Sequence, residues 1–131
     1  MIVKRISDES FGDLGVIEFA NLSFVCQRAY WITNFVQGNS RGNHAHKTLT
    51  QFVIVLSGSV TFELFRGKAR EVVVLTANDG GILIHPGTWR KFYSHISSSV
   101  VMVLCNQEYR EEDYIRKWDE YQDWFSINYE S

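Results

Sequence analysis

The sequence predicts an all-β protein, a small barrel or sandwich of antiparallel strands that ends in a short helical segment. Three observations support this prediction. From Phe24 to Leu104, short apolar runs alternate with turn residues at the ~8–12-residue spacing of all-β folds. Aromatic and β-branched residues, which favour strands, are mixed in these runs. From Glu111 to Phe125 the aromatic residues recur at helical spacing instead.

The expected strands follow one another along the chain. Their ranges are Phe24–Phe35, Gln51–Leu56, Val60–Phe65, Glu71–Leu75, Ile82–His85, Trp89–Ile96 and Val100–Leu104. Turn residues rich in Gly, Asn, Asp and Ser separate them, most clearly at Asn78–Gly81. In the segment Glu111–Phe125, acidic residues stand at the start, as a helix N-terminus prefers, so one or two helical turns are expected there.

Length and composition limit the class of protein. The 131 residues fit one domain over 1–131, and 45% hydrophobic with 21% charged residues is typical of a folded soluble protein. The net charge of −2 excludes a strongly basic nucleic-acid binder. No apolar run reaches membrane-spanning length, and the charged start Met1–Ser10 is unlike a signal peptide. Cys26 and Cys105 lie in apolar runs and are expected to be buried thiols, which fits a reducing cytoplasm.

The most informative motif is Arg41-Gly42-Asn43-His44-Ala45-His46. Side chains alternate along a strand, so His44 and His46 project from the same face. The motif resembles the first motif of the cupin superfamily, small jelly-roll barrels in which two histidines line the cavity. The segment Gly81–Arg90, with its Pro-Gly step, resembles the second cupin motif. This resemblance implies a cupin barrel.

Metal-binding cupins hold a divalent ion with these two histidines, a glutamate and a later histidine. In this sequence Gln51 stands near the glutamate position and Arg90 near the last histidine. A neutral amide is a poor substitute for a carboxylate, and a guanidinium repels a cation. We therefore expect no metal and no other cofactor. Two alternatives stay open, a catalytic metal site and a pair of core histidines without chemistry.

A closer resemblance covers the chain from about Leu14 to Phe125. It rests on the segments Arg28–Ile32, Arg41–Lys47, Leu56–Ser59, Trp89–Arg90 and Glu112–Arg116, together with Gln51. These segments resemble the dTDP-sugar 3,4-ketoisomerases, cupins that act on dTDP-4-keto-6-deoxyglucose and feed 3-amino sugars into bacterial lipopolysaccharide, including O-antigen, or antibiotics. The resemblance implies a cytoplasmic isomerase that converts this substrate into a dTDP-3-keto-6-deoxy-D-hexose.

The chemistry suits these residues. Moving a carbonyl from C4 to C3 needs a proton taken from C3 and a proton delivered to C4, and a neutral imidazole can do both. By resemblance His46 is the main proton shuttle, and His44 positions or polarises the sugar. Tyr30 is expected to hydrogen bond the sugar. Fixed positive charge for the diphosphate is expected from Arg41 first, then from Arg28 and Lys47. The remaining expected substrate-binding residues are Gln51, Trp89, Arg90 and Phe11.

Two departures from the family pattern bear on stereochemistry. Phe11 stands before Gly12 where family members commonly carry arginine, and Arg90 follows Trp89 where some carry histidine. An aromatic residue and an arginine at these positions accompany gluco products in this family, so a gluco product is expected. A homodimer is expected by analogy, with a strand Ile2–Ile6 crossing to the partner. Such domains also occur fused to an acetyltransferase in longer chains.

Two other functions remain open. The first is a 3,5-epimerase-like cupin acting on dTDP-4-keto-6-deoxy sugars. The pair of His44 and His46 argues against it, because those epimerases use a single histidine base with a tyrosine acid. The second is a non-catalytic cupin module that binds a sugar nucleotide. Both alternatives keep the barrel and the nucleotide ligand and differ in what happens to the sugar.

Overall fold

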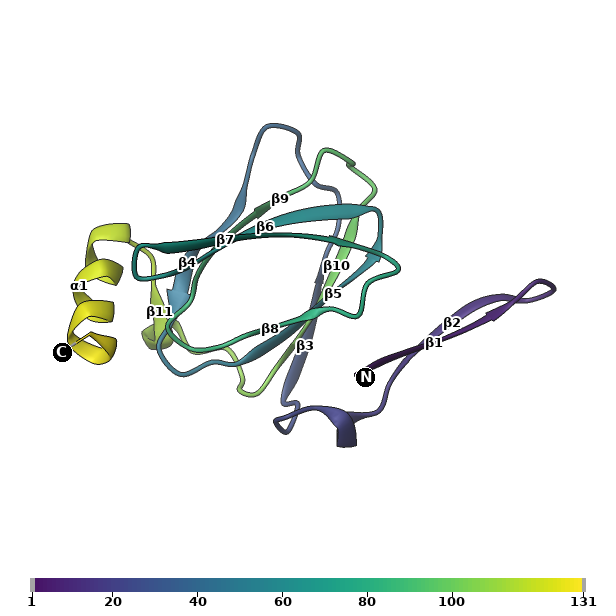
Figure 1. The fold of residues 1–131 in the computed structure, drawn as a ribbon, viewed down its shortest axis with the longest axis horizontal. Coiled ribbons are helices and arrows are strands. Elements are labelled where there is room, and N and C mark those ends of the chain that lie inside the picture. The colour runs from purple at the N-terminus through teal and green to yellow at the C-terminus, as the bar shows by residue number, and fades with distance from the viewer. Residues whose placement is uncertain (1, 131) are drawn as a thin grey trace.

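The computed structural model describes residues 2–130, whose strands form a barrel of two antiparallel sheets (Figure 1). The four-stranded sheet has the order β3-β10-β5-β8, and the five-stranded sheet has the order β11-β4-β9-β6-β7. Their bounds are β3 Arg28–Ile32, β4 Arg41–His46, β5 Gln51–Ser57, β6 Ser59–Arg66, β7 Ala69–Thr76, β8 Ile82–Ile84, β9 Trp89–Tyr93, β10 Val100–Cys105 and β11 Tyr114–Ile115. From β3 to β11, consecutive strands alternate between the two sheets except for β6 and β7, which pair within one sheet, and the expected jelly-roll barrel is confirmed.

The barrel interior is apolar because each strand turns alternate side chains inward. Residues from both sheets meet there, among them Val53 and Val103 from the first sheet and Phe62 and Phe92 from the second. A second cluster covers the outer face of the four-stranded sheet, where Val3 and Leu22 of the N-terminal segment are part of the packing. Cys26 and Cys105 are free thiols, and Cys105 is fully buried as expected, whereas Cys26 is only half-buried.

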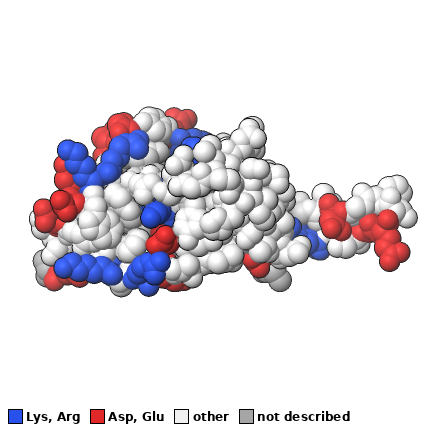
Figure 2. All heavy atoms as spheres, turned by 90° about the horizontal axis from the view of Figure 1, so that it is seen from above, with Lys and Arg blue, Asp and Glu red and all other residues white. Residues whose placement is uncertain are grey.

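The N-terminal residues form a hairpin that extends away from the barrel (Figure 1). It consists of β1 (Val3–Asp8) and β2 (Gly12–Ile17), followed by the short 3₁₀ helix η1 (Phe19–Asn21). Acidic side chains gather at its far end (Figure 2). Phe11 in the turn is 92% exposed, so an apolar ring lies in solvent at the end of the hairpin.

The C-terminal segment differs in detail from the expectation of one or two helical turns near Glu111. A 3₁₀ helix η2 (Glu111–Asp113) leads into β11, which pairs with His46 and Ala45 of β4. The α-helix α1 then runs over Trp118–Tyr129 and packs beside β4 and β11 on the outer face of the five-stranded sheet (Figure 1). Tyr114 and Ile115 pair through their backbone with β4, a strand distant in sequence, and the α-helix therefore begins only at Trp118.

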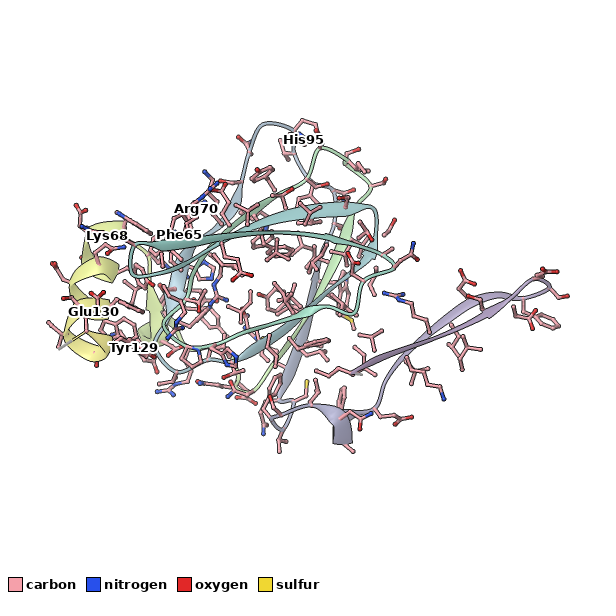
Figure 3. The ribbon with its side chains drawn as sticks, in the orientation of Figure 1. Phe65, Lys68, Arg70, His95, Tyr129 and Glu130 are labelled. Carbon is pink, nitrogen blue, oxygen red and sulfur yellow. The ribbon has the colours of Figure 1, made fainter. Side chains whose placement is uncertain are left out.

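Aromatic packing fixes α1 on the barrel. Tyr121 is fully buried, and its hydroxyl donates to the Gly87 carbonyl at 2.7 Å and accepts from the Gly67 N–H at 2.9 Å. Tyr129 and Glu130 lie near the β6–β7 turn that carries Lys68 (Figure 3). Within residues 2–130, neither the length nor the hydropathy of any helix suffices for a membrane span.

Candidate active site

A cavity of about 470 Å³ lies between the two sheets. Its lining combines buried apolar side chains, among them Val53 and Phe62, with charged and polar side chains, of which Gln51 and Arg90 are also buried. Tyr30 and Gln51 reach it from the four-stranded sheet, and His44 and Arg90 reach it from the five-stranded sheet. An apolar pocket with convergent polar groups is the usual form of a small-molecule site.

A bulge in β4 brings the histidine motif to this cavity. The pairing of β4 with β9 shifts register between Gly42 and His44, and Asn43 takes a left-handed conformation with φ of 56°. Gly42 has φ of 85°, and a Cβ there would lie 2.8 Å from the Arg90 carbonyl oxygen. The glycine of the motif is therefore required for the close approach of β4 to β9.

His46 is held by a carboxylate that sequence reasoning left without a role. Its Nδ1 donates a hydrogen bond to Asp113 Oδ2 at 3.1 Å, and the two side chains are 1% and 6% exposed. The other oxygen of Asp113 accepts from the backbone N–H and hydroxyl of Thr48 at 2.8 and 2.7 Å. This arrangement places the imidazole proton on Nδ1 and leaves a lone pair on Nε2.

A backbone carbonyl gives His44 the same tautomer as His46, with the proton on Nδ1. The Nδ1 of His44 donates to the Gly42 carbonyl at 3.0 Å, which leaves Nε2 as the acceptor atom. The ring lies 4.8 Å from the His46 ring and 4.9 Å from the Tyr114 ring, measured between centroids. His44 lines the cavity, while His46 lies directly behind His44 and Tyr114. The predicted pair is thus brought together, one ring at the cavity surface and one a layer deeper.

Both imidazoles are neutral at neutral pH. Burial, followed by the charge of the Arg90 guanidinium, lowers the pKa of His44 to about 4. The same two causes lower the pKa of His46. Arg90 is itself fully buried, which lowers its pKa to about 10, so it stays charged at neutral pH. Two neutral bases therefore lie near one buried cation.

A hydrogen-bond network joins the residues that stand where metal cupins place ligands. Arg90 Nη1 donates to Gln51 Oε1, and Gln51 Nε2 donates to the Tyr30 hydroxyl at 3.1 Å. Arg90 Nη2 donates to the Thr88 carbonyl at 3.0 Å. These residues do not fit a divalent ion, because a guanidinium occupies the amide oxygen that would serve as a ligand. Within residues 2–130, no three His, Cys, Asp or Glu side chains converge on such a position.

Three buried nitrogen atoms lack a hydrogen-bond partner among the residues that the structure describes. They are Arg28 Nε, His46 Nε2 and Arg90 Nε. Arg28 and Arg90 line the cavity, and the ring of His46 packs against two lining residues. Buried polar atoms are rarely left unpaired, so these two donors and one acceptor are available to a ligand bound in the cavity.

The structure does not bring every expected residue to the cavity. Arg28, Tyr30, Arg41, His44, Gln51 and Arg90 line it. His46 is not among the lining residues and contacts His44 and Tyr114, which are. Trp89 precedes Arg90 in β9 and faces the other way, where it packs at ring distances of 5.3 Å on Trp118 and 5.5 Å on Tyr121. Lys47 comes after the end of β4 and is exposed, outside the cavity lining. Phe11 lies on the protruding hairpin.

Residues 109–116 add groups that sequence reasoning did not assign. Asp113 holds His46, Tyr114 packs on both histidines, and Arg116 lines the cavity. Their signal was present in the motif Glu112–Arg116, but a position some 67 residues from His46 shows no contact until β11 pairs with β4. The motif can therefore be recognised in the sequence, but the contacts that its residues make depend on the pairing of β11 with β4.

The fold and site define a cupin-type barrel whose cavity carries paired neutral histidines and arginines. A family model described as "FdtA: WxcM-like, C-terminal" matches residues 1–126. The chain belongs to this family, and the expected kinship with the dTDP-sugar 3,4-ketoisomerases is confirmed.

Two relatives are similar over nearly their full length. The chain is 32% identical over 128 residues to the TDP-4-oxo-6-deoxy-alpha-D-glucose-3,4-oxoisomerase of Aneurinibacillus thermoaerophilus, covering 97% of this chain and 92% of that protein. It is 34% identical to the sugar 3,4-ketoisomerase QdtA of Thermoanaerobacterium thermosaccharolyticum, solved in complex with TDP, with a TM-score of 0.89 and coverage of 97% and 93%. The dTDP-4-dehydrorhamnose 3,5-epimerase of Bacillus anthracis, with TDP and PPi bound, has a TM-score of 0.73 at 15% identity over 86% of this chain and 73% of that one, which shows a shared fold.

Proposed function

We propose that this chain converts dTDP-4-keto-6-deoxy-D-glucose into a dTDP-3-keto-6-deoxy-D-hexose without metal or other cofactor. The kinship with 3,4-ketoisomerases supports the reaction type. The observation that carries the proposal is the buried, unpaired Nε2 of a neutral His46 beside the cavity. A buried base with a free lone pair is suited to remove a proton from a bound sugar.

The reaction follows as two proton transfers at carbon and one between the oxygens. His46 Nε2 takes the proton from C3, and the electron pair moves into a C3–C4 double bond while the C4 oxygen becomes an enolate. The proton of the C3 hydroxyl passes to the C4 oxygen as the C3 carbonyl forms, and the protonated His46 Nε2 delivers its proton to C4. Asp113 accepts from Nδ1 throughout and stabilises the imidazolium that forms between the two transfers. The substrate's own ketone is the electron sink, so no external oxidant is required.

Negative charge develops on the C3 and C4 oxygens and needs fixed donors nearby. Arg90 is charged, buried and retains a free Nε–H, which suits it to this role. Tyr30 keeps its proton, because burial raises the pKa of its hydroxyl, and can donate to a sugar oxygen. His44, at the cavity surface, then positions the sugar. Arg28 and Arg41 are the proposed partners of the diphosphate.

We also propose a gluco product and a homodimer. Arg90 in the cavity supports the first, as the residue expected with gluco products. The exposed hairpin with Phe11 at its turn and Leu14 56% exposed supports the second, since apolar side chains on a projecting hairpin favour docking on a second copy. Sedimentation should give twice the 15.2 kDa mass of the chain, and a species of 15.2 kDa would contradict the dimer.

The product's new ketone at C3 suits it to an aminotransferase, so we place the enzyme in cytoplasmic 3-amino sugar synthesis. The test is incubation of chelator-dialysed protein with dTDP-4-keto-6-deoxyglucose, followed by NMR of the sugar. A carbonyl at C3 is the expected result. An inverted C5 would instead support an epimerase, and unchanged substrate with measurable dTDP binding would support a binding module. Activity that requires added metal would overturn the cofactor-free reaction.

A further inference from the structure

The cavity arginines differ in their partners. Four arginines line the cavity, namely Arg28, Arg41, Arg90 and Arg116. Within residues 2–130, Arg116 alone among them forms an ion pair with a carboxylate. The partner is Glu111, five residues earlier on the segment that also carries Asp113. The charge of Arg116 at the cavity is thus already paired with a carboxylate of the same chain.

The ion pair occupies the side of Arg116 that would bind a phosphate. Nε donates to Glu111 Oε1 and Nη2 donates to Oε2, both at 2.8 Å. This is the two-bond fork with which arginine also binds phosphate oxygens, so a phosphate cannot use it until Glu111 leaves. The pair lowers the pKa of Glu111 to about 2, which keeps the carboxylate charged at all physiological pH values.

Both partners are held in place by neighbouring aromatic residues. The Arg116 guanidinium lies 4.1 Å from the centre of the Tyr114 ring, a cavity residue, and this contact keeps it beside the cavity. The Tyr109 hydroxyl donates to Glu111 Oε2. When Glu111 leaves, Arg116 therefore stays stacked on Tyr114, and its fork becomes free toward the cavity.

Exchange of partners is energetically easy. The Arg116 and Glu111 side chains are 51% and 57% exposed, and ion pairs in water stabilise a protein little. A diphosphate carries more negative charge than one carboxylate and is also attracted by Arg28 and Arg41. The diphosphate therefore competes successfully for Arg116, while a ligand without phosphate does not.

We propose that Arg116 binds the diphosphate of the nucleotide and that Glu111 is an internal competitor, which occupies Arg116 in the free enzyme and weakens nucleotide binding. This inference deepens the proposed function, because it assumes a nucleoside diphosphate in the cavity. It concerns affinity alone and makes no use of the proton-transfer residues. The ion pair makes the cavity selective for ligands with enough charge to displace a carboxylate.

The test is a double-mutant cycle read by calorimetric titration with dTDP. Arg116→Ala should weaken dTDP binding about tenfold, the loss of a charge-assisted hydrogen bond. Glu111→Gln should tighten binding about threefold, because the competing ion pair is removed. In the Arg116→Ala background, Glu111→Gln should change nothing. Thymidine, which lacks phosphate, should bind all variants alike.

A matched control lies on the same segment. Arg110 pairs with Glu112 at 3.1 Å, is similarly exposed, and is outside the cavity lining. Arg110→Ala and Glu112→Gln should leave dTDP binding unchanged. Thermal unfolding checks that each variant folds, and Arg116→Gln, which keeps more of the side chain, serves where the alanine variant does not.

Three results would overturn the inference. The first is wild-type dTDP affinity in Arg116→Ala. The second is an equal gain from Glu111→Gln with and without Arg116, which would mean simple repulsion of the ligand by Glu111. The third is an equal gain from Glu112→Gln. Because binding is measured without turnover, these results stand apart from the test of the isomerase reaction, which could fail while the binding cycle succeeds.

Discussion

Replacing Asp113 by Asn tests how His46 is prepared as a base. The carboxylate accepts from His46 Nδ1–H at 3.1 Å and from Thr48 through its other oxygen. An asparagine can keep its oxygen toward Thr48 only by turning its NH₂ group toward His46. Two donors would then face each other, and the imidazole relieves this by moving its proton from Nδ1 to Nε2. The atom that should take the C3 proton has then lost its lone pair.

The expected size of the effect follows from the burial of the pair. Both side chains are almost fully enclosed, so water cannot restore the lost tautomer. We expect Asp113→Asn to lower kcat by about 10²–10⁴-fold, the usual contribution of general base catalysis, with dTDP affinity nearly unchanged. Isomerisation is followed by NMR, and the tautomer is read from the nitrogen shifts of the His46 ring.

Thr48→Val provides the matched control, because it removes the 2.7 Å bond to Asp113 Oδ1 and leaves the bond to His46. It should cost stability but keep the tautomer and most of kcat. If Asp113→Asn moves the proton to Nε2 and kcat stays at the wild-type value, His46 Nε2 is not the base. If Thr48→Val lowers kcat as much as Asp113→Asn, the carboxylate acts only as a structural support.

Two further predictions concern stability and stereochemistry. The pKa of His44 is about 4 in the folded protein and ~6.5 in the unfolded chain. The contribution of neutral His44 to the free energy of unfolding is therefore complete above pH 6.5 and is lost as the pH falls toward 4. Between pH 7 and pH 5, His44 should lower the free energy of unfolding by about 2 kcal/mol, which urea unfolding at the two pH values measures. If His44→Asn loses as much stability over this range as the wild type, His44 is not the cause. If Arg90 sets the face protonated at C4, Arg90→His should raise the galacto fraction of the product, measured by NMR. An unchanged product ratio in an active Arg90→His variant would show that other residues set this face.

Much of the barrel could be predicted from local sequence. The expected strand Gln51–Leu56 is observed as Gln51–Ser57, and Val60–Phe65 as Ser59–Arg66, because alternation and turn residues are local signals. The strand expected to reach Ile96 ends at Tyr93 instead, where the Ser94 hydroxyl contacts the backbone carbonyls of Ser59 in β6 and Ile96 in the following loop. The short strand β11 depends on pairing with β4, which no local pattern reports.

The part of the candidate site that lies on a single strand could be predicted from the sequence. The proximity of His44 and His46 follows from the pleat, and the partner Asp113 does not, because it comes from a distant segment. Trp89 shows the limit of a motif: it was expected at the substrate beside Arg90, yet neighbours in a strand face opposite ways. The alternation of side chains along a strand already predicts, from the sequence alone, that Trp89 and Arg90 lie on opposite faces of β9.

In the proposed mechanism, His46 opens the reaction by taking the proton from C3. The most direct measurement is exchange of the C3 hydrogen with deuterated solvent, followed by NMR of dTDP-4-keto-6-deoxyglucose with the wild-type enzyme and with His46→Asn and His44→Asn. We expect exchange with the wild type, a loss of about 10²–10⁴-fold in His46→Asn, and slow but measurable exchange in His44→Asn. Undiminished exchange at C3 in His46→Asn, with only formation of the isomer lost, would contradict it and make another residue the base.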